Sequence, residues 1–181
     1  MNLIIKLLAA AILAGTPLLF GTLGEVLTEK SGNLNLGVEG IMFMGGVCGF
    51  AGAYYYEVFA NGQVNGVVAV FIALLIAFLS GAFGAFIYSV LTITLKANQN
   101  VTGLALTIFG TGFGNFFGEV LGNKAGGFVA VGAATKNAFN SGIPGLSQLP
   151  VVGSVLFSYN FMVYLAIILA VVLAIFLNKT R

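Results

Sequence analysis

Apolar segments long enough to cross a bilayer follow one another along this chain, and only short polar joints separate most of them. The sequence has 181 residues, of which 59% are hydrophobic and 7% are charged, and its mean hydropathy is +1.07. Soluble domains carry roughly 25% charged residues, and about 20 apolar residues cross a bilayer as a helix. Because backbone in lipid must satisfy its own hydrogen bonds, we expect an all-α integral membrane protein.

The apolar segments predict about five transmembrane helices, or four with one re-entrant piece. They cover residues 3–27, 40–56, 67–95, 102–121 and 159–177. Pro17 lies in the middle of the first segment and predicts a kink, because proline removes a helical hydrogen bond. A secretory signal peptide is the alternative for this segment, since Lys6 precedes an apolar run.

A different composition marks residues 122–158, which are rich in glycine, alanine, asparagine and serine. This stretch predicts an extracellular loop, in which residues 143–150 form an ordered turn or a short surface helix. No soluble domain and no long tandem repeat is visible in the sequence. We therefore expect residues 1–181 to form a single transmembrane domain.

The most polar interruption between two apolar segments is residues 31–40, which we call the helix break. Asparagine and glutamate side chains are poorly tolerated by hydrocarbon, and glycine allows sharp turns and close approach. If the break lies at membrane depth, its polar groups must face protein or a water-filled cavity, which is typical of a transport pathway. The alternative is an ordinary hairpin turn at the membrane surface. A second polar interruption, residues 96–103, contains three consecutive amide side chains: Asn98, Gln99 and Asn100.

Small residues recur at four-residue spacing in two of the apolar segments. This spacing places them on one helical face, where a neighbouring helix can pack closely. We predict helix-packing stripes at Gly45 and Gly49, and at Gly110, Gly114 and Gly118.

The residue types that are absent or rare in the sequence argue against several kinds of site. The chain has no histidine, one cysteine (Cys48) and five acidic residues, all glutamate. It therefore offers no nucleophile–base pair and no cluster at metal-ligand spacing, and we predict neither enzymatic activity nor a cofactor. No P-loop motif and no basic cluster occurs, which disfavours ATP hydrolysis by this chain and binding to nucleic acid.

The positive-inside rule gives a small preference for one orientation. With the C-terminus in the cytoplasm and five spans, the N-terminus lies outside. Four basic residues then lie inside (Lys30, Lys96, Lys179 and Arg181) and three outside (Lys6, Lys124 and Lys136).

Three blocks of sequence resemble a known family. They are TPLLF (residues 16–20) with EKSGNLNLGVEG (29–40), KANQNVTGLALT (96–107), and IPGL (143–146) followed by Pro150 and Gly153. In this order they resemble membrane permease subunits of bacterial ABC importers of the ribose, branched-chain amino acid and nucleoside type. The nucleoside subfamily, which works with lipoproteins of the basic-membrane-protein kind, is the most similar.

The resemblance implies a permease of the bacterial plasma (inner) membrane that imports a small polar solute, a nucleoside or a sugar, by alternating access. It also implies four kinds of partner: a cytoplasmic ATPase subunit, a second permease subunit, an extracellular lipoprotein that binds the substrate, and the lipid bilayer. In this family the helix break lines the translocation pathway, and amide side chains can both donate and accept hydrogen bonds. The expected pathway residues are Asn33, Asn35, Glu39, Asn98, Gln99 and Asn100.

Family members continue well beyond a span that ends in Lys-Thr-Arg, so we expect this chain to be the N-terminal portion of a longer permease. Alone, it is not expected to couple ATP hydrolysis to transport. Two other readings remain open. One is a self-contained channel or secondary transporter, for which glycine-rich broken helices are equally suitable. The other is a structural membrane subunit without a transport role.

Overall fold

The structure is a computed structural model that describes residues 3–140 and 159–179. Its elements are α1 (Leu3–Lys30), α2 (Val38–Phe59), α3 (Gly66–Ser89), the π-helix η1 (Val90–Thr94), α4 (Gln99–Lys124), α5 (Ala133–Phe139) and α7 (Phe161–Lys179). Within these residues no strand occurs. Four stretches are long and apolar enough to cross a membrane: α1, α3 with η1, α4 and α7. Together with the glycine-rich α2, they confirm an all-α membrane protein of about five spans.

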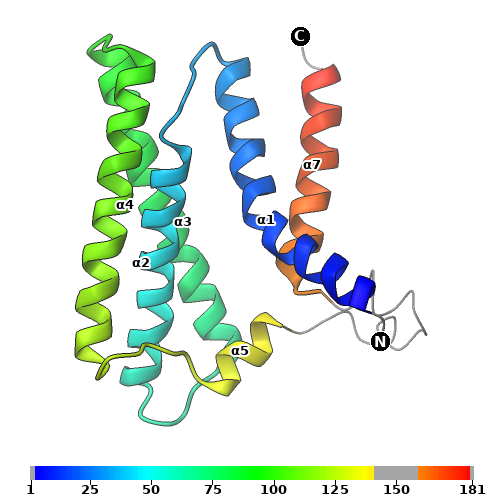
Figure 1. Cartoon of the computed structure of the whole chain (residues 1–181), viewed down its shortest axis with the longest axis vertical. Coiled ribbons are helices and arrows are strands. Elements are labelled where there is room, and N and C mark those ends of the chain that lie inside the picture. The colour runs from blue at the N-terminus through cyan, green and yellow to red at the C-terminus, as the bar shows by residue number, and fades with distance from the viewer. Residues whose placement is uncertain (1–2, 141–158, 180–181) are drawn as a thin grey trace. The chain divides into compact units, whose positions relative to one another are not determined.

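By its packing the chain divides into two units, Met1–Gly24 with Phe139–Arg181, and Glu25–Ala138. In the first unit, α1 continues as a helix through Pro17, and Figure 1 shows that it changes direction along its length. The hydroxyl of Thr16 donates to the carbonyl of Ile12 at 2.8 Å. The turn or short helix predicted at residues 143–150 lies outside the described residues.

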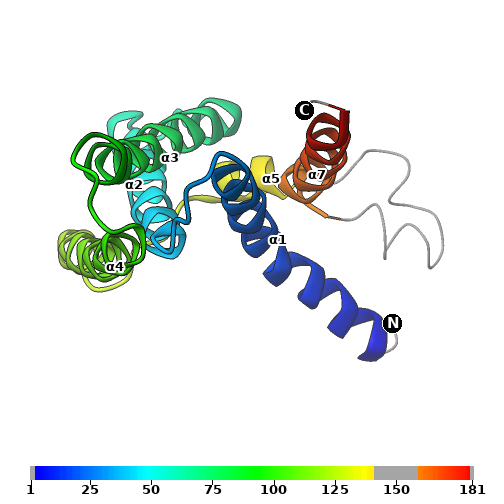
Figure 2. The ribbon, with the colours of Figure 1, turned by 90° about the horizontal axis from the view of Figure 1, so that it is seen from above.

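In the second unit, α2 packs against α3 on one side and against α4 on another (Figures 1 and 2). Its glycines allow the approach to α3. A Cβ atom built on Gly49 would lie 2.8 Å from the carbonyl oxygen of Ala73, and one on Gly45 would lie 3.2 Å from that of Ala77. The backbones of α2 and α3 are thus nearly in contact, as small residues permit between membrane helices.

Glycines on α4 allow a comparable approach to α2. A Cβ atom on Gly110 would lie 2.4 Å from the carbonyl oxygen of Gly40, and one on Gly114 would lie 2.2 Å from the ring of Phe43. The third member of the predicted stripe behaves differently. Gly118 is exposed, and an added Cβ would meet nothing within 4 Å. The stripe therefore makes close contact at two of its three positions.

The predicted segment 67–95 is not a single regular helix. The α-helix ends at Ser89, and a π-helical stretch, Val90–Thr94, continues it. Lys96 then adopts a φ of 53°, which is uncommon for a residue with a side chain. Asn98 caps the start of α4, because its side chain accepts a hydrogen bond from the amide of Val101 at 3.2 Å. The fourth helix therefore starts before residue 102, so that Gln99 and Asn100 are helical.

The stretch predicted as an extracellular loop, residues 122–158, contains the short helix α5 in its described part. Glu57 at the end of α2 accepts hydrogen bonds from the amide of Gly132, at 2.8 and 3.0 Å, and from the hydroxyl of Thr135. On the other side, Gly66 lies so near Ala134 that an added Cβ would be 2.3 Å from its carbonyl oxygen. The start of α5 is therefore held against the last turns of α2 and the first residue of α3.

We expect the Glu57→Ala variant to release the start of α5. The amide of Gly132 and the hydroxyl of Thr135 both lose their charged acceptor, and hydrogen bonds to charged groups contribute about 1.5–3 kcal/mol. Amide hydrogen exchange of residues 130–138 should rise about tenfold or more by the same figure. Glu119→Ala, which removes an exposed carboxylate from α4, is the control. Equal exchange in both variants would contradict the prediction.

Candidate functional site

The structure limits the helix break to residues 31–37, between the end of α1 and the start of α2. The chain leaves α1 through Gly32, whose φ of 87° favours glycine. The amide of Asn33 then donates back to the carbonyl of Thr28 at 3.1 Å, which closes the helix. The following residues have no helical partners for their backbone groups, so side chains from other helices must supply them.

Leu34 is held on both of its backbone polar groups. Its amide donates to Oε1 of Gln99 at 2.8 Å, and its carbonyl accepts from the hydroxyl of Tyr88 at 2.6 Å. Gln99 also donates through Nε2 to Oδ1 of Asn33 at 3.2 Å. One glutamine from the first turn of α4 thus fixes both the backbone and a side chain of the break.

The next residue, Asn35, is held from α1 and in turn starts α2. Its amide donates to Oε1 of Glu25 at 3.0 Å, while its own Oδ1 accepts from the amide of Gly37 at 2.9 Å. Asn35 is only 7% exposed. The other carboxylate oxygen of Glu25, Oε2, is buried and has no hydrogen-bond partner within the described part of the chain. The side-chain oxygen of Asn35, which we expected to meet solute, therefore fixes the backbone at the start of α2.

The last part of the break lies against α4. The hydroxyl of Thr107 donates to the carbonyl of Leu36 at 2.7 Å. A Cβ atom added to Gly103 would lie 2.7 Å from the amide nitrogen of Leu36, so only glycine fits here. The break is therefore tied to α1, α3 and α4 at once, which makes it an ordered structure and not a loose surface turn.

Of the six predicted pathway residues, the structure brings three together. Asn33, Asn35 and Gln99 meet at the break, whereas Asn98 caps α4 and is exposed. The remaining two are also exposed: Glu39, in the first turn of α2, and Asn100, in the first turn of α4.

Three residues that hold the break were not selected from the sequence: Glu25, Tyr88 and Thr107. A signal existed for Glu25, because an ionisable residue within an apolar segment marks a functional position by default. Tyr88 and Thr107 look like ordinary helix residues, and their partners lie 54 and 71 residues away in the sequence. Only the fold could reveal them.

A pocket of about 300 Å³ opens beside the break. Hydroxyl and amide side chains form much of its wall, and none of its lining residues is charged. They are Leu27, Thr28, Ser31, Asn33, Asn35, Ala85, Tyr88, Ser89 and Ile93.

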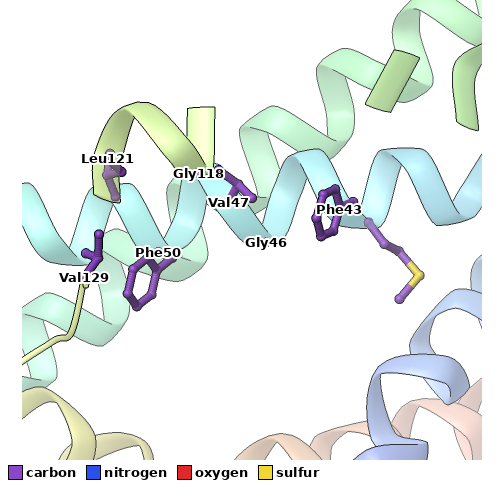
Figure 3. Close-up of a pocket in the computed structure, with 8 residues that line it drawn as sticks. Phe43, Gly46, Val47, Phe50, Gly118, Leu121 and Val129 are labelled. Atoms are coloured by element: carbon purple, nitrogen blue, oxygen red, sulfur yellow. The ribbon is translucent and has the colours of Figure 1, made fainter. Parts of the chain in front are cut away.

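A second pocket, of about 280 Å³, has a different character. Apolar groups of α2 and α4 line it, with Val129 at its edge, and it includes Phe43, Phe50 and Leu121 (Figure 3). Its walls offer no hydrogen-bonding side chain, so it suits a lipid chain or an apolar side chain. Among the described pockets, the one at the break is therefore the candidate for a polar solute.

The family described as the permease component of the branched-chain amino acid transport system matches residues 7–181. The chain belongs to this family. The resemblance seen in the three sequence blocks is thereby confirmed. As a family member with four apolar helices of spanning length, it is a multi-pass protein of the plasma membrane.

Curated relatives carry names of sugar and nucleoside permeases. The putative glucose ABC transporter permease protein TsgC13 of Haloferax volcanii is 33% identical over 181 residues, which cover 97% of this chain and 48% of the relative. The guanosine ABC transporter permease protein NupQ of Bacillus subtilis is 32% identical over 165 residues, which cover 91% of this chain and 48% of the relative. The nucleoside ABC transporter permease protein NupC of Lactococcus lactis is 29% identical over 180 residues, covering 97% and 52%. The chain thus spans about half the length of the curated relatives it matches. No solved structure matches it.

Proposed function

We propose that this permease-family chain forms part of the translocation pathway of an ABC importer for a small, neutral, polar solute, a nucleoside first of all. The observation that carries the proposal is the pocket at the break, whose lining offers hydroxyl and amide groups but no charge. Amides present donors and acceptors to a base edge or a ribose, and the ring of Tyr88 offers an apolar face. The nucleoside permeases among the relatives support the same solute class.

An amino acid suits this pocket less well. A free amino acid carries a carboxylate and an ammonium group, and removing charges from water without partners of opposite sign is costly. A nucleoside or a sugar needs only hydrogen bonds. The lining of the pocket therefore favours a neutral solute over the branched-chain amino acids in the family's description.

The proposal includes partners and excludes catalysis by this chain. A cytoplasmic ATPase subunit would supply the energy, a second permease subunit would complete the pathway, and an extracellular lipoprotein would deliver the solute. We also propose that the chain acts as a portion of a longer permease, because it spans about half the length of each relative. Purification of the native complex from its own membranes, followed by mass spectrometry, tests these points. A complex without an ATPase would favour a channel or a secondary transporter.

Uptake of labelled guanosine by cells that produce the complete importer tests the solute pathway. We expect Asn33→Asp to reduce uptake at least tenfold, since a charge of about −1 then lies in the path of a neutral solute. Aspartate still accepts the hydrogen bond from Gln99, so the break keeps this contact. The control is Gln63→Glu, which adds the same charge at an exposed position in the turn between α2 and α3. Unchanged uptake in the Asn33 variant would remove the pocket from the pathway.

A further inference from the structure

The two residues that hold Leu34 lie at the two ends of one short segment of the chain. Tyr88 is in the last turn of α3 and Gln99 is the first residue of α4. They bind the carbonyl and the amide of Leu34 at 2.6 and 2.8 Å. We call this pair of contacts the latch. Any change in the distance or angle between the two ends must strain or break one of its hydrogen bonds.

The segment between the two ends has irregular backbone. It begins as the π-helix Val90–Thr94, in which the amide of Leu95 reaches the carbonyl of Val90 at 3.0 Å. The amide of Ala97 then bonds to the carbonyl of Leu91 at 2.9 Å, and Lys96 between them has a φ of 53°. Such π-helical turns occur frequently at functional sites, and left-handed backbone costs energy for residues other than glycine.

Space lies beside this segment. A pocket of about 360 Å³ is formed by Leu91 and Ile87 on one side and by α4 on the other, including Leu106 and Phe109. On this side the segment is not enclosed by close-packed neighbours among the described residues, and such packing is what resists movement.

We propose that Tyr88 and Gln99 are positioning residues that hold the break in the shape the solute pathway requires, and that the segment 90–98 is the joint that sets and releases this latch. The inference rests on the proposed function for its role in transport, because the break lines the solute pocket. That Tyr88 and Gln99 hold Leu34 depends only on the observed hydrogen bonds. A shift of the joint would free Leu34 and with it Asn33, which Gln99 also holds.

Amide hydrogen exchange of residues 31–37, measured on the protein in lipid nanodiscs, tests the latch directly. Gln99→Leu should raise this exchange about tenfold, because the amide of Leu34 loses its acceptor. Tyr88→Phe should raise it as well, since the carbonyl of Leu34 loses its donor. Gln99→Glu keeps an acceptor for Leu34 and should raise exchange less than Gln99→Leu.

Matched controls come from the other end of the second unit. Tyr56→Phe removes a hydroxyl that accepts from the amide of Asn65, and Gln63→Leu replaces an exposed amide side chain. Neither change touches the break. If the amides of residues 31–37 exchange no faster in Gln99→Leu and Tyr88→Phe than in these controls, the latch does not exist.

The joint is tested by a substitution that makes no contact with Leu34. Lys96→Val places a β-branched residue at positive φ, which should distort the joint and raise exchange in residues 31–37 about tenfold. Asn61→Val is the control, because Asn61 has a φ of 45° in the turn between α2 and α3. Amides of residues 45–55 should exchange equally in both variants. Equal exchange of residues 31–37 in both would show that the joint does not control the latch.

Guanosine uptake by the complete importer then separates the two proposals. Gln99→Leu should lower the maximal rate of uptake about tenfold, and Gln99→Glu should restore part of it, because the glutamate still accepts from Leu34. Full uptake by Gln99→Leu would overturn the role of the latch in transport. If the unmodified importer takes up no guanosine, the solute assignment fails, while the exchange measurements still decide whether the latch exists.

Discussion

Replacing Gly110 with alanine should destabilise the protein more than any other single methyl group added to α4. The new Cβ atom would lie 2.4 Å from the carbonyl oxygen of Gly40 and 2.6 Å from its Cα. Both are backbone atoms of α2, so no side chain can turn away, and the two helices must separate. Overpacking a well-packed contact costs about 1–3 kcal/mol, and we expect the upper end here. SDS titration of the protein in mixed micelles measures this loss in the free energy of unfolding.

Two other glycines of the same helix serve as controls. An added Cβ would meet nothing within 4 Å at Gly112 or at Gly118. Alanine is also the better helix former, by roughly 1 kcal/mol. Gly112→Ala and Gly118→Ala should therefore leave stability unchanged or raise it slightly. A Gly110→Ala protein as stable as these two would show that α2 and α4 do not pack at Gly40.

The second large effect is expected from Glu25→Ala. The amide of Asn35 would lose its acceptor, the Oε1 atom of Glu25, and Asn35 is only 7% exposed. A buried donor without a partner costs about 1–3 kcal/mol. The same SDS titration should show this loss. Glu25→Gln keeps an acceptor oxygen, so its free energy of unfolding should fall less than that of Glu25→Ala.

Glu29→Ala is the matched control for the same helix. Glu29 lies four residues nearer the end of α1 and is exposed, and substitutions at such positions change stability by about 0.5 kcal/mol at most. If the Glu25 and Glu29 variants unfold at the same SDS concentration, then Glu25 does not hold the break.

Much of the fold could be predicted because it depends on local properties of the sequence. Long apolar segments become helices in a bilayer, whatever their neighbours are, since the backbone has no other partner there. The predicted starts and ends were displaced where a cap or an irregular turn intervened, as at Asn98 and at the π-helix Val90–Thr94. Helical periodicity does not record either feature.

The position of the break could be predicted from the sequence, but the contacts that hold it could not. Two amides and three glycines in ten residues marked residues 31–40 as unusual. Gln99 was selected because it lies in the second polar interruption, residues 96–103. The amino acid sequence could not say that Gln99 holds Leu34, because the two residues are 65 positions apart. Both Asn33 and Asn35 line the pocket, and the sequence could not show that the side chain of Asn35 fixes the start of α2 whereas that of Asn33 accepts from Gln99.

The sequence by itself therefore determined that this protein lies in a lipid bilayer, where its helices are, and where the break lies. Each of these follows from the polarity of consecutive residues. The tertiary structure alone decided which backbone groups of the break are held, and by which side chains. Glu25, Tyr88, Gln99 and Thr107 reach it from three helices. Hydrogen bonds act over about 3 Å, so a partner distant in sequence is set only by how the helices pack.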